Sequence, residues 1–298
     1  FDCYCEEEQK MNENTNFSQE VTKRARKSNS VNKGMRSKVT LRVITYIFAA
    51  LILSLFLLAL IPGIRYWNLD FFTQAPSNGM TSGGIFPALL GSILLTLLSL
   101  AIAIPLGILL GIVLSEYNLE YIRFVVTILS GIPSVVYGLF GLGLFCITLG
   151  MRTSILAGAL TLALMVLPVI SSSVYETMHA IPRELREAAY ALGARKSEVI
   201  FEMLVPSVKR SILTVSFVAA GRAIGETAPL ILTAAVFYAT NLPTSLLSPV
   251  MTLPTHLYFL SASYGESARW MAQGTTSVLI LFVIVVYTIA FAFRRERK

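Results

Sequence analysis

Two oppositely charged residues, Arg222 and Glu226, stand four positions apart in an otherwise uncharged run of the chain. Residues at this spacing share one face of an α-helix, so the guanidinium and the carboxylate can pair. A guanidinium also offers a planar set of donors to the oxygens of an oxyanion. Two interpretations stay open: a clip between helices, or an anion contact in which Glu226 holds Arg222 while the site is empty. Thr227 adds a hydroxyl beside them.

The second stretch whose side chains could serve a function, 181–206, is a long charged segment in an otherwise apolar chain. Apolar residues recur there at i, i+3, i+4 and i+7, the pattern of a helix with one narrow apolar face. Such a helix suits docking into a groove on a soluble partner. Its charged members are Arg183, Glu184, Arg186 and Glu187, and its apolar stripe is Leu185, Ala188, Ala189 and Leu192.

Punctuating residues set the expected limits of this stretch. Pro182 suits the first helical position, and Gly193 suits the C-terminal cap. Ser197 is expected to cap a second helix, and Pro206 to stop it. The sequence thus predicts a helix, a glycine turn and a second helix.

A third segment combines hydroxyls with helix-weakening residues. Ser130, Gly131, Pro133 and Ser134 lie together in an apolar run, with further glycines following. An interrupted helix at membrane depth is tolerated only where protein or water covers the freed backbone groups. The segment is either a packing kink or part of a substrate pathway, in which case Ser130 and Ser134 would line it.

Enzymatic chemistry finds no support in the sequence. No G-x-x-x-x-G-K-[ST] phosphate loop occurs, and no nucleophilic triad or metal-ligand cluster is readable. We therefore expect no catalytic residue, no bound metal and no cofactor in this chain, so that any energy source must be another polypeptide.

The elements that position these residues are membrane spans. Hydrophobic residues make up 55% of the 298, charged residues only 14%, and a soluble protein would carry charge on about a quarter of its positions. Apolar runs of about 20 residues cross a bilayer. The expected fold is an all-α polytopic membrane protein with six transmembrane helices. Its predicted spans are 43–64, 88–114, 124–149, 154–174, 211–238 and 275–293.

Basic residues predict the orientation. Lysines and arginines cluster before the first span and after the last, so both termini are expected to be cytoplasmic, as is the loop 181–210. The net charge of +7 is attributed to contact with anionic membrane lipid and not to nucleic acid. The segment 242–260 is apolar but broken by three prolines, so we expect it to be interfacial or re-entrant.

Two domains are expected. Residues 1–38 form a polar, basic tail predicted to be disordered and cytoplasmic, with 1–10 a candidate non-native extension. Residues 39–298 form the transmembrane domain. Within it, Gly107 and Gly111 make a face of small residues on which another helix of the same chain is expected to pack.

The charged loop resembles a known family. Glu187, Ala188, Ala189, Gly193 and the run Met203–Pro206 are similar to the EAA loop of ABC-importer permeases, E-A-A-x3-G-x9-I-x-L-P, with two apolar replacements. The resemblance implies a type I ABC-importer permease fold in which this loop is the coupling helix gripped by an ATPase. The implied contact residues are Arg183, Arg186, Glu187, Ala188, Ala189 and Gly193.

Further stretches narrow the resemblance. The segments GRAIGETAPLILTA, SGIPSVVYGLFGLGLF, GGIFPALLGSILLT and PTSLLSPVMTLPTHLYFL are similar to phosphate ABC-importer permeases, the last to the A-type subunit. The match runs from about Gly83 to the C-terminus. It implies a phosphate pathway near Arg222, Glu226, Thr227, Ser130 and Ser134.

The resemblance also implies partners and a location. These are a sibling C-type permease chain, a cytoplasmic ABC ATPase dimer that binds ATP and Mg²⁺, and an extracytoplasmic phosphate-binding protein, at the bacterial plasma (inner) membrane. A permease for sulfate or molybdate would share the loop but should lack the 221–234 signature. A secondary carrier would leave the loop unexplained, whereas a membrane scaffold would use 181–206 to recruit a cytosolic partner. Co-purification of an ATPase would separate both from an importer permease.

Overall fold

The computed structural model describes residues 40–117, 119–239 and 241–295, so the predicted tail 1–38 lies outside the described residues. The chain divides into two units, 1–58 and 59–298. The first spanning helix is Thr40–Ile64. The elements that follow are α2 (Leu69–Thr73), β1 (Pro76–Ser77), β2 (Ser82–Gly83), α3 (Phe86–Glu116), α4 (Glu120–Gly131), α5 (Ser134–Gly141), α6 (Ile155–His179), α7 (Arg183–Ala191), α8 (Lys196–Glu198), α9 (Val205–Gly225), α10 (Ala228–Thr233), α11 (Leu253–Phe259) and α12 (Arg269–Arg295).

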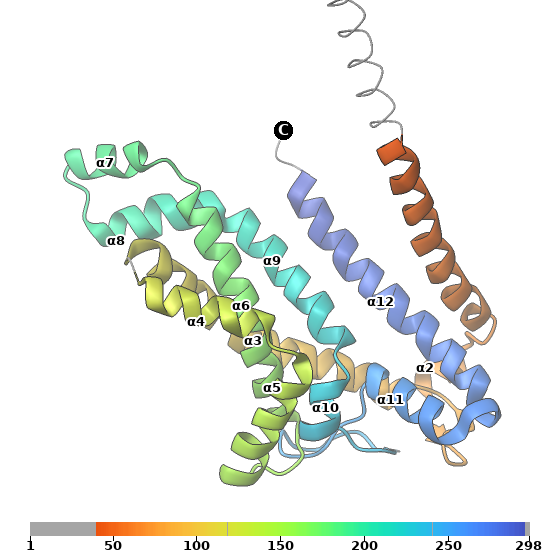
Figure 1. The fold of residues 1–298 in the computed structure, drawn as a ribbon. Helices are drawn as coiled ribbons and strands as arrows, with labels where there is room; N and C mark the ends of the chain where they lie inside the picture. The colour runs from red at the N-terminus through yellow and green to blue at the C-terminus, as the bar shows by residue number, and fades with distance from the viewer. Residues whose placement is uncertain (1–39, 118, 240, 296–298) are drawn as a thin grey trace, which may run out of the picture. The chain divides into compact units, whose positions relative to one another are not determined.

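Five described helices are long and apolar enough to cross a membrane, and a sixth span results if the bent pair of α4 and α5 counts as one. This agrees with the six predicted spans in number. Figure 1 shows the long helices α3, α6, α9 and α12 of the second unit, with the short helices α10 and α11 at one end. The predicted span 211–238 is wrong in its limits, because the continuous helix runs from Lys196 to Gly225.

The core of the second unit forms where α3 crosses α6. A Cβ on Gly107 would lie 2.8 Å from Ile170 Cγ2, and one on Gly111 would lie 2.6 Å from Val174 Cβ. Only residues without a side chain let the two helices approach this closely, which is how small residues drive helix association in lipid. The predicted face of small residues is thus confirmed as packing within the chain.

The third span is broken as the sequence indicated. Helix α4 ends at Gly131, α5 begins at Ser134, and a π-helical turn Leu142–Thr148 completes the second half. The two halves meet at 102°. Ile132 is extended, because a residue before proline is pushed out of the helical region, and Pro133 then precedes the new helix.

Close contacts hold α5 against α6 and α10. A Cβ on Gly138 would lie 2.7 Å from Pro229 Cα, and one on Gly141 would lie 2.2 Å from Thr161 Oγ1. Gly158 of α6 meets Ala234, just past α10, in the same way at 2.4 Å. These contacts pack the second half of the broken span against α6 and α10, whereas the break itself, at Gly131 and Pro133, is exposed in the described unit.

The segment 242–260 does not form a separate spanning helix. Its first part is irregular, Val250 pairs with Ala235 in an isolated bridge, and α11 begins only at Leu253. Helix α11 packs with α2 and α12 in a second apolar cluster around Phe71, Met251 and Met271. The helical run that begins with α11 continues to Phe293 as one candidate span of 41 residues, and the start of α11 is buried. Whether this segment is interfacial stays a prediction.

Two glycines of the third span give a test of this packing. Gly141→Ala should destabilise the chain by about 1–3 kcal/mol, because its methyl group has no room beside Thr161. Gly143→Ala should be neutral, since a Cβ there meets nothing within 4 Å. Thermal denaturation of the purified protein in detergent measures both, and equal midpoints for the two variants would contradict the close packing of α5 on α6.

Candidate functional site

The charged pair lies where α9 breaks. Helix α9 ends at Gly225, Glu226 follows with ψ of 123°, and Thr227 precedes α10. The expectation that Arg222 and Glu226 share one helix face is therefore wrong. Pro229 explains the break, because it offers no N–H to the carbonyl four residues earlier, on Gly225, and its ring would collide with it.

The ion pair nevertheless forms across this break. Arg222 Nε lies 3.5 Å from a carboxylate oxygen of Glu226, and their side chains are 35% and 17% exposed. Part of the Arg222 side chain is therefore exposed at the surface of the described unit. An ionised group near the bilayer centre costs about 2.5–3.5 kcal/mol when unpaired. The pair is thus neutralised in place while part of Arg222 stays available to an anion.

The break in the third span lies beside this site. Tyr137 of α5 is close enough to Arg222 for an electrostatic interaction, and its hydroxyl donates to the carbonyl of Leu129 on α4, at 2.8 Å. Tyr137 thereby spans the bend between α4 and α5. The sequence reasoning did not select it, although it was the polar aromatic residue nearest the serines.

The two predicted pathway serines lie at the bend of the third span and not at the ion pair. Ser130 is exposed, and its hydroxyl donates to the carbonyl of Thr127 at 2.7 Å, while Ser134 is partly buried at the start of α5. Neither serine makes a described hydrogen bond to Arg222 or Glu226. Thr227 is adjacent to the ion pair in the chain, at the N-terminal cap of α10, with no capping bond from its side chain. The structure brings Tyr137 to Arg222, and the serines only to the nearby bend.

The charged loop forms the predicted helix and glycine turn. Pro182 caps α7, which begins one residue later than expected, and Gly193 follows its end with φ of +89°. The amide of Gly193 donates to the carbonyl of Tyr190 at 2.9 Å, and that of Ala194 to Ala189 at 3.1 Å. These two bonds make a Schellman C-cap, which requires the left-handed conformation that glycine adopts readily.

Beyond the turn, two predicted boundaries are wrong. The second helix is capped at Arg195, whose amide donates to Glu198 at 2.7 Å, so Ser197 lies inside it. Pro206 does not end the helix but sits in the first turn of α9, directly after a π-helical turn, Val199–Leu204. The wider π turn changes the bonding pattern before the proline and lets the helix continue.

An ion pair fixes α7 to the end of α3. Arg186 pairs with Glu116, and the two side chains are 15% and 5% exposed. The same guanidinium donates to the carbonyl of Met178 on α6 at 2.7 Å. Lys196 Nζ donates to the carbonyl of Glu116 at 3.4 Å and lies 3.8 Å from the ring centre of Tyr117. Arg186 is therefore turned inward. Sequence reasoning missed Glu116, the acidic residue at the end of the second span.

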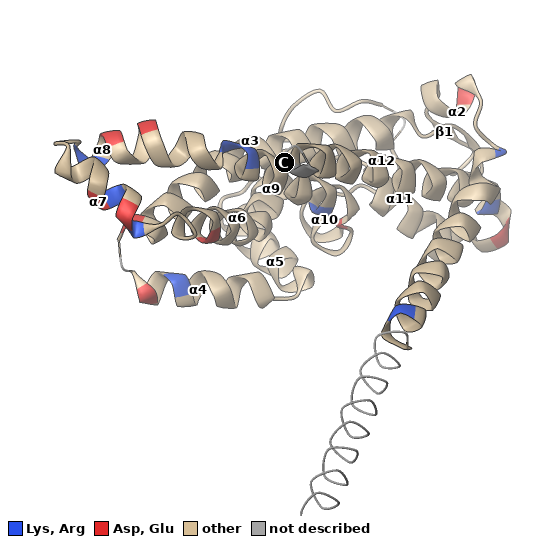
Figure 2. Cartoon of the chain, turned by 90° about the horizontal axis from the view of Figure 1, so that it is seen from above, with Lys and Arg blue, Asp and Glu red and all other residues tan. Residues whose placement is uncertain are grey.

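The remaining surface of α7 is free in the described unit. Leu185 and Leu192 are 55% and 91% exposed, and Ala188 between them is exposed too, so the three form an apolar ridge. Ala189 of the same predicted stripe packs on the core instead. Arg183 and Glu187 are exposed beside the ridge. Figure 2 shows acidic and basic residues gathered over α7, α8 and the start of α4.

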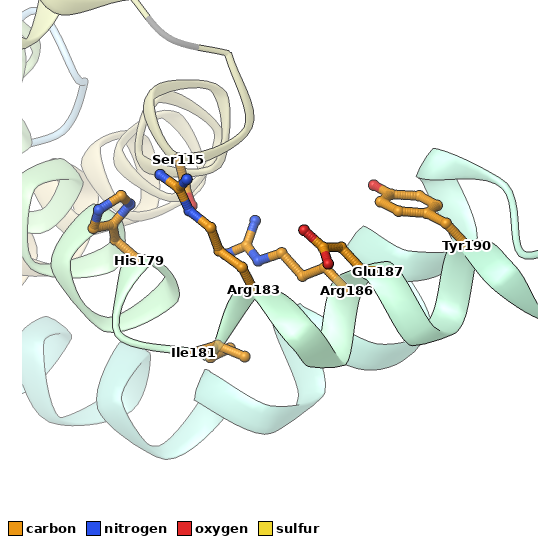
Figure 3. A pocket seen from close by; sticks show the side chains of 7 residues that line it. All are labelled: Ser115, His179, Ile181, Arg183, Arg186, Glu187 and Tyr190. Atoms are coloured by element: carbon orange, nitrogen blue, oxygen red, sulfur yellow. The ribbon is translucent and has the colours of Figure 1, made fainter.

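A recess lies between α7 and the C-terminal ends of α3 and α6. It measures about 250 Å³ and is lined by Ser115 of α3, His179 of α6 and residues of α7 that include Arg183 and Glu187. Figure 3 shows Arg183 reaching toward Ser115 and His179. The Ser115 hydroxyl is buried without a partner in the described structure. The outer surface of α7 therefore combines an apolar ridge, exposed charged side chains and a recess.

Metal binding finds no support in the described ranges. Among the residues that the structure describes, no group of three or more His, Cys, Asp and Glu side chains could hold an ion. The expectation of no cofactor in this chain stays a prediction.

Broken spans beside a charge pair, together with an exposed helix outside the spans, are typical of a multi-pass membrane transport subunit. The chain belongs to the family of binding-protein-dependent transport system inner membrane components, whose model matches residues 103–296. The family resemblance read from the sequence is thereby confirmed.

Several curated proteins are similar over most of the chain. A probable phosphate transport system permease protein PstA from Methanocaldococcus jannaschii is 31% identical over 243 residues, covering 80% of this chain and 84% of the relative. PstA from Xylella fastidiosa is 34% identical over 231 residues, with coverages of 76% and 79%. A probable ABC transporter permease, YqgI of Bacillus subtilis, is 30% identical over 275 residues, with coverages of 84% and 94%.

Solved structures agree on the fold. A chain of a bacterial alginate ABC transporter, in complex with its periplasmic protein, matches with a TM-score of 0.61 at 15% identity, covering 88% of this chain and 94% of that one. A chain of the inward-facing MetNI methionine ABC transporter matches with a TM-score of 0.53 at 19% identity, with coverages of 72% and 92%. The predicted all-α importer-permease fold is confirmed.

The Arg186–Glu116 pair gives a second test. Arg186→Gln should lower the free energy of unfolding by about 3 kcal/mol, because it leaves the buried Glu116 carboxylate unpaired. Arg183→Gln is the matched control, since Arg183 is an exposed arginine of the same helix. Thermal denaturation of the purified chain in detergent, without the partner subunits, compares them.

The charge-exchanged double variant, Arg186→Glu with Glu116→Arg, tests whether the lost stability comes from the ion pair or from the changed size of the side chains. It should recover part of the loss, and an Arg186→Gln variant as stable as Arg183→Gln would show that the ion pair does not hold α7.

Proposed function

We propose that this chain is a permease subunit of an ATP-driven importer of inorganic phosphate and forms the membrane path together with a sibling permease chain of the C type. Similarity to PstA proteins over about three quarters of the chain or more supports the substrate. The observation that carries the proposal is the partly exposed Arg222, paired with Glu226 where α9 breaks. A planar donor fork at this place fits a tetrahedral oxyanion.

Arg222 and Glu226 act together in this proposal. Glu226 neutralises the guanidinium while the path is empty, and phosphate competes for the same donors when it arrives. The attraction must stay moderate, because a deep energy well would trap the ion instead of passing it on. The 3.5 Å separation of the pair, longer than a strong charge-assisted hydrogen bond, leaves room for this exchange.

A separate ATPase dimer, which binds ATP and Mg²⁺, would drive the cycle through α7. The exposed ridge of Leu185, Ala188 and Leu192 offers an apolar face to a groove, with Arg183 and Glu187 at its side. From Lys196 a continuous helix of 30 residues leads to Gly225. Movement of α7 is thus carried along about 39 Å of helix to Arg222. A phosphate-binding protein would deliver the ion on the opposite, outer face.

This account also assigns the orientation. The end of the unit that carries α7 and the last residues of α12 is the cytoplasmic end, in agreement with the basic residues at the C-terminus of the sequence. Both termini are then cytoplasmic in the plasma membrane.

Substitution of Arg222 tests the path. In the reconstituted complex, Arg222→Gln should lower phosphate uptake at least tenfold, because it removes charge-assisted hydrogen bonds of about 1.5–3 kcal/mol each. Arg269→Gln is the control, since Arg269 forms an exposed ion pair with Glu266 away from this site. Uptake of radiolabelled phosphate measures both, and co-purification of the partner subunits confirms assembly. Wild-type uptake by an assembled Arg222→Gln complex would favour the structural clip instead. Uptake of sulfate or molybdate in place of phosphate would favour another oxyanion permease.

Substitution of Gly193 tests coupling. A β-branched residue is strained at φ of +89°, whereas asparagine tolerates a left-handed conformation far better. Gly193→Val should therefore reduce the phosphate carried per ATP hydrolysed, and Gly193→Asn should retain most of it. The ratio of uptake to ATPase activity is the measurement. An unchanged ratio in Gly193→Val would argue against a role of this turn in coupling.

A further inference from the structure

The recess beside α7 is a second place, apart from the Arg222–Glu226 pair, where polar side chains of several helices meet. Its volume of about 250 Å³ is several times the space of about 30 Å³ that one water molecule takes in the liquid. It is smaller than the pockets of about 300–1,000 Å³ that hold drug-sized ligands. His179, Arg183 and Tyr190 of the lining are exposed, so the recess is open at the surface of the unit. These dimensions suit a small ion.

Two of the lining side chains offer donors that nothing in the described ranges uses. The hydroxyl of Ser115, on α3, is buried without a hydrogen-bond partner there. Arg183 of α7 makes no described hydrogen bond or ion pair, and Figure 3 shows it reaching toward Ser115 and His179. A buried polar group without a partner is unfavourable, so the Ser115 hydroxyl would gain from a ligand in the recess.

His179, at the end of α6, supplies a third donor. Its ring stacks on Tyr175, with 5.3 Å between the ring centres and 19° between the planes. The hydroxyl of Tyr175 in turn accepts a hydrogen bond from Arg123 of α4 at 2.7 Å. Stacking uses the face of the imidazole and leaves the nitrogens at its edge able to donate, one when the ring is neutral and both when it is protonated. The stack thus holds a donor ring at the recess.

The charges of the lining favour an anion on the side of Arg183. Arg186 is already paired with Glu116. Glu187 is a carboxylate of the lining, and in Figure 3 it lies apart from the three donors. Arg183 and Glu187 are four positions apart but form no ion pair in the part of the chain that the structure describes. An unpaired guanidinium beside O–H and N–H donors matches a tetrahedral oxyanion.

The recess and the apolar ridge lie on opposite sides of α7. At about 100° per residue, positions 183, 186, 187 and 190 fall within an arc of about 100°, and 185, 188 and 192 fall within about 60° on the other side. A partner that binds the ridge therefore need not cover the recess.

We propose that this recess is an oxyanion site, in which Arg183, Ser115 and His179 bind a phosphate group. The group is either free inorganic phosphate or the phosphate of an anionic lipid headgroup, since both present the same oxygens. The first source rests on the proposed function, which delivers phosphate to the side of the membrane on which α7 lies. The second source does not depend on it.

A bound phosphate group joins α7 to two spans, because its three donors belong to α3, α6 and α7. It adds to the Arg186–Glu116 pair, which already holds α7 at the end of α3. The bound group therefore opposes movement of α7, the step on which the proposed import depends.

The test uses the complete complex in nanodiscs, without nucleotide, with Arg222→Gln present throughout to weaken binding at the proposed path. Arg183→Gln is compared with Lys209→Gln, since Lys209 is an exposed cation of α9 that does not line the recess. Ser115→Ala is the second variant, because removal of a hydroxyl without a partner should not unfold the chain. Binding of radiolabelled inorganic phosphate is measured in neutral phosphatidylcholine, and retention of phosphatidylglycerol after delipidation is measured by mass spectrometry.

For free phosphate, Arg183→Gln should weaken binding about tenfold or more and Ser115→Ala less, with Lys209→Gln unchanged. Glu187→Gln should strengthen binding, because it removes a like charge from the lining. For a lipid headgroup, Arg183→Gln and Ser115→Ala should instead lower the retained phosphatidylglycerol while phosphate binding stays unchanged. Equal phosphate binding and equal retained lipid in all variants would overturn the proposal.

The restraint on α7 has its own measurement. In the same Arg222→Gln complex, inorganic phosphate should slow hydrogen exchange of the α7 amides, and Ser115→Ala should need a higher phosphate concentration for the same effect. Exchange of these amides that does not respond to bound phosphate would overturn the restraint. Failure of the proposed function is a different result, namely that the wild-type complex imports no phosphate.

Discussion

An ionised side chain at membrane depth needs an opposite charge, and an interrupted backbone there needs protein around it. Both demands meet at the end of α9, where Arg222 pairs with Glu226 across the break that Pro229 imposes. Beyond the neighbouring break in the third span, α5 is held by the close fit of Gly138 on Pro229 and of Gly141 on Thr161. The site exists because glycines let three broken or short helices pack tightly enough to shelter it.

The same constraint links the site to the outer helix α7. Because Pro206 follows a π turn and does not stop the helix, the segment from Lys196 to Gly225 is continuous. At its start, Arg186 and Lys196 hold α7 and α8 to the end of α3. A force on α7 therefore reaches α3, α6 and α9 together. An importer driven by a partner outside the membrane requires such a connection between a surface helix and the partly exposed Arg222–Glu226 pair.

Much of this arrangement could be predicted from the sequence. Composition and apolar runs predicted the spans, Gly193 predicted the turn after α7, and Pro133 with its neighbours predicted the bend of the third span. The wrong helix limits at Pro206 and near Pro229 arose because a proline can either be accommodated in a helix or break it. Pro206 is tolerated after a π turn, whereas Pro229 breaks the helix, and neither the π turn nor its position has a readable sequence signal. Glu116 was missed because its partner is distant in sequence, and a single sequence gives no contact between distant residues.

The central claim is that the chain opens a path for phosphate only when an ATP-hydrolysing partner acts on it. Its most direct test is phosphate accumulation in proteoliposomes that contain either this chain alone or the chain with its sibling permease and ATPase, supplied with ATP and a phosphate-loaded binding protein. The account predicts accumulation only in the complete, ATP-supplied system. Phosphate uptake by the chain alone, at the rate of the complete system, would contradict it.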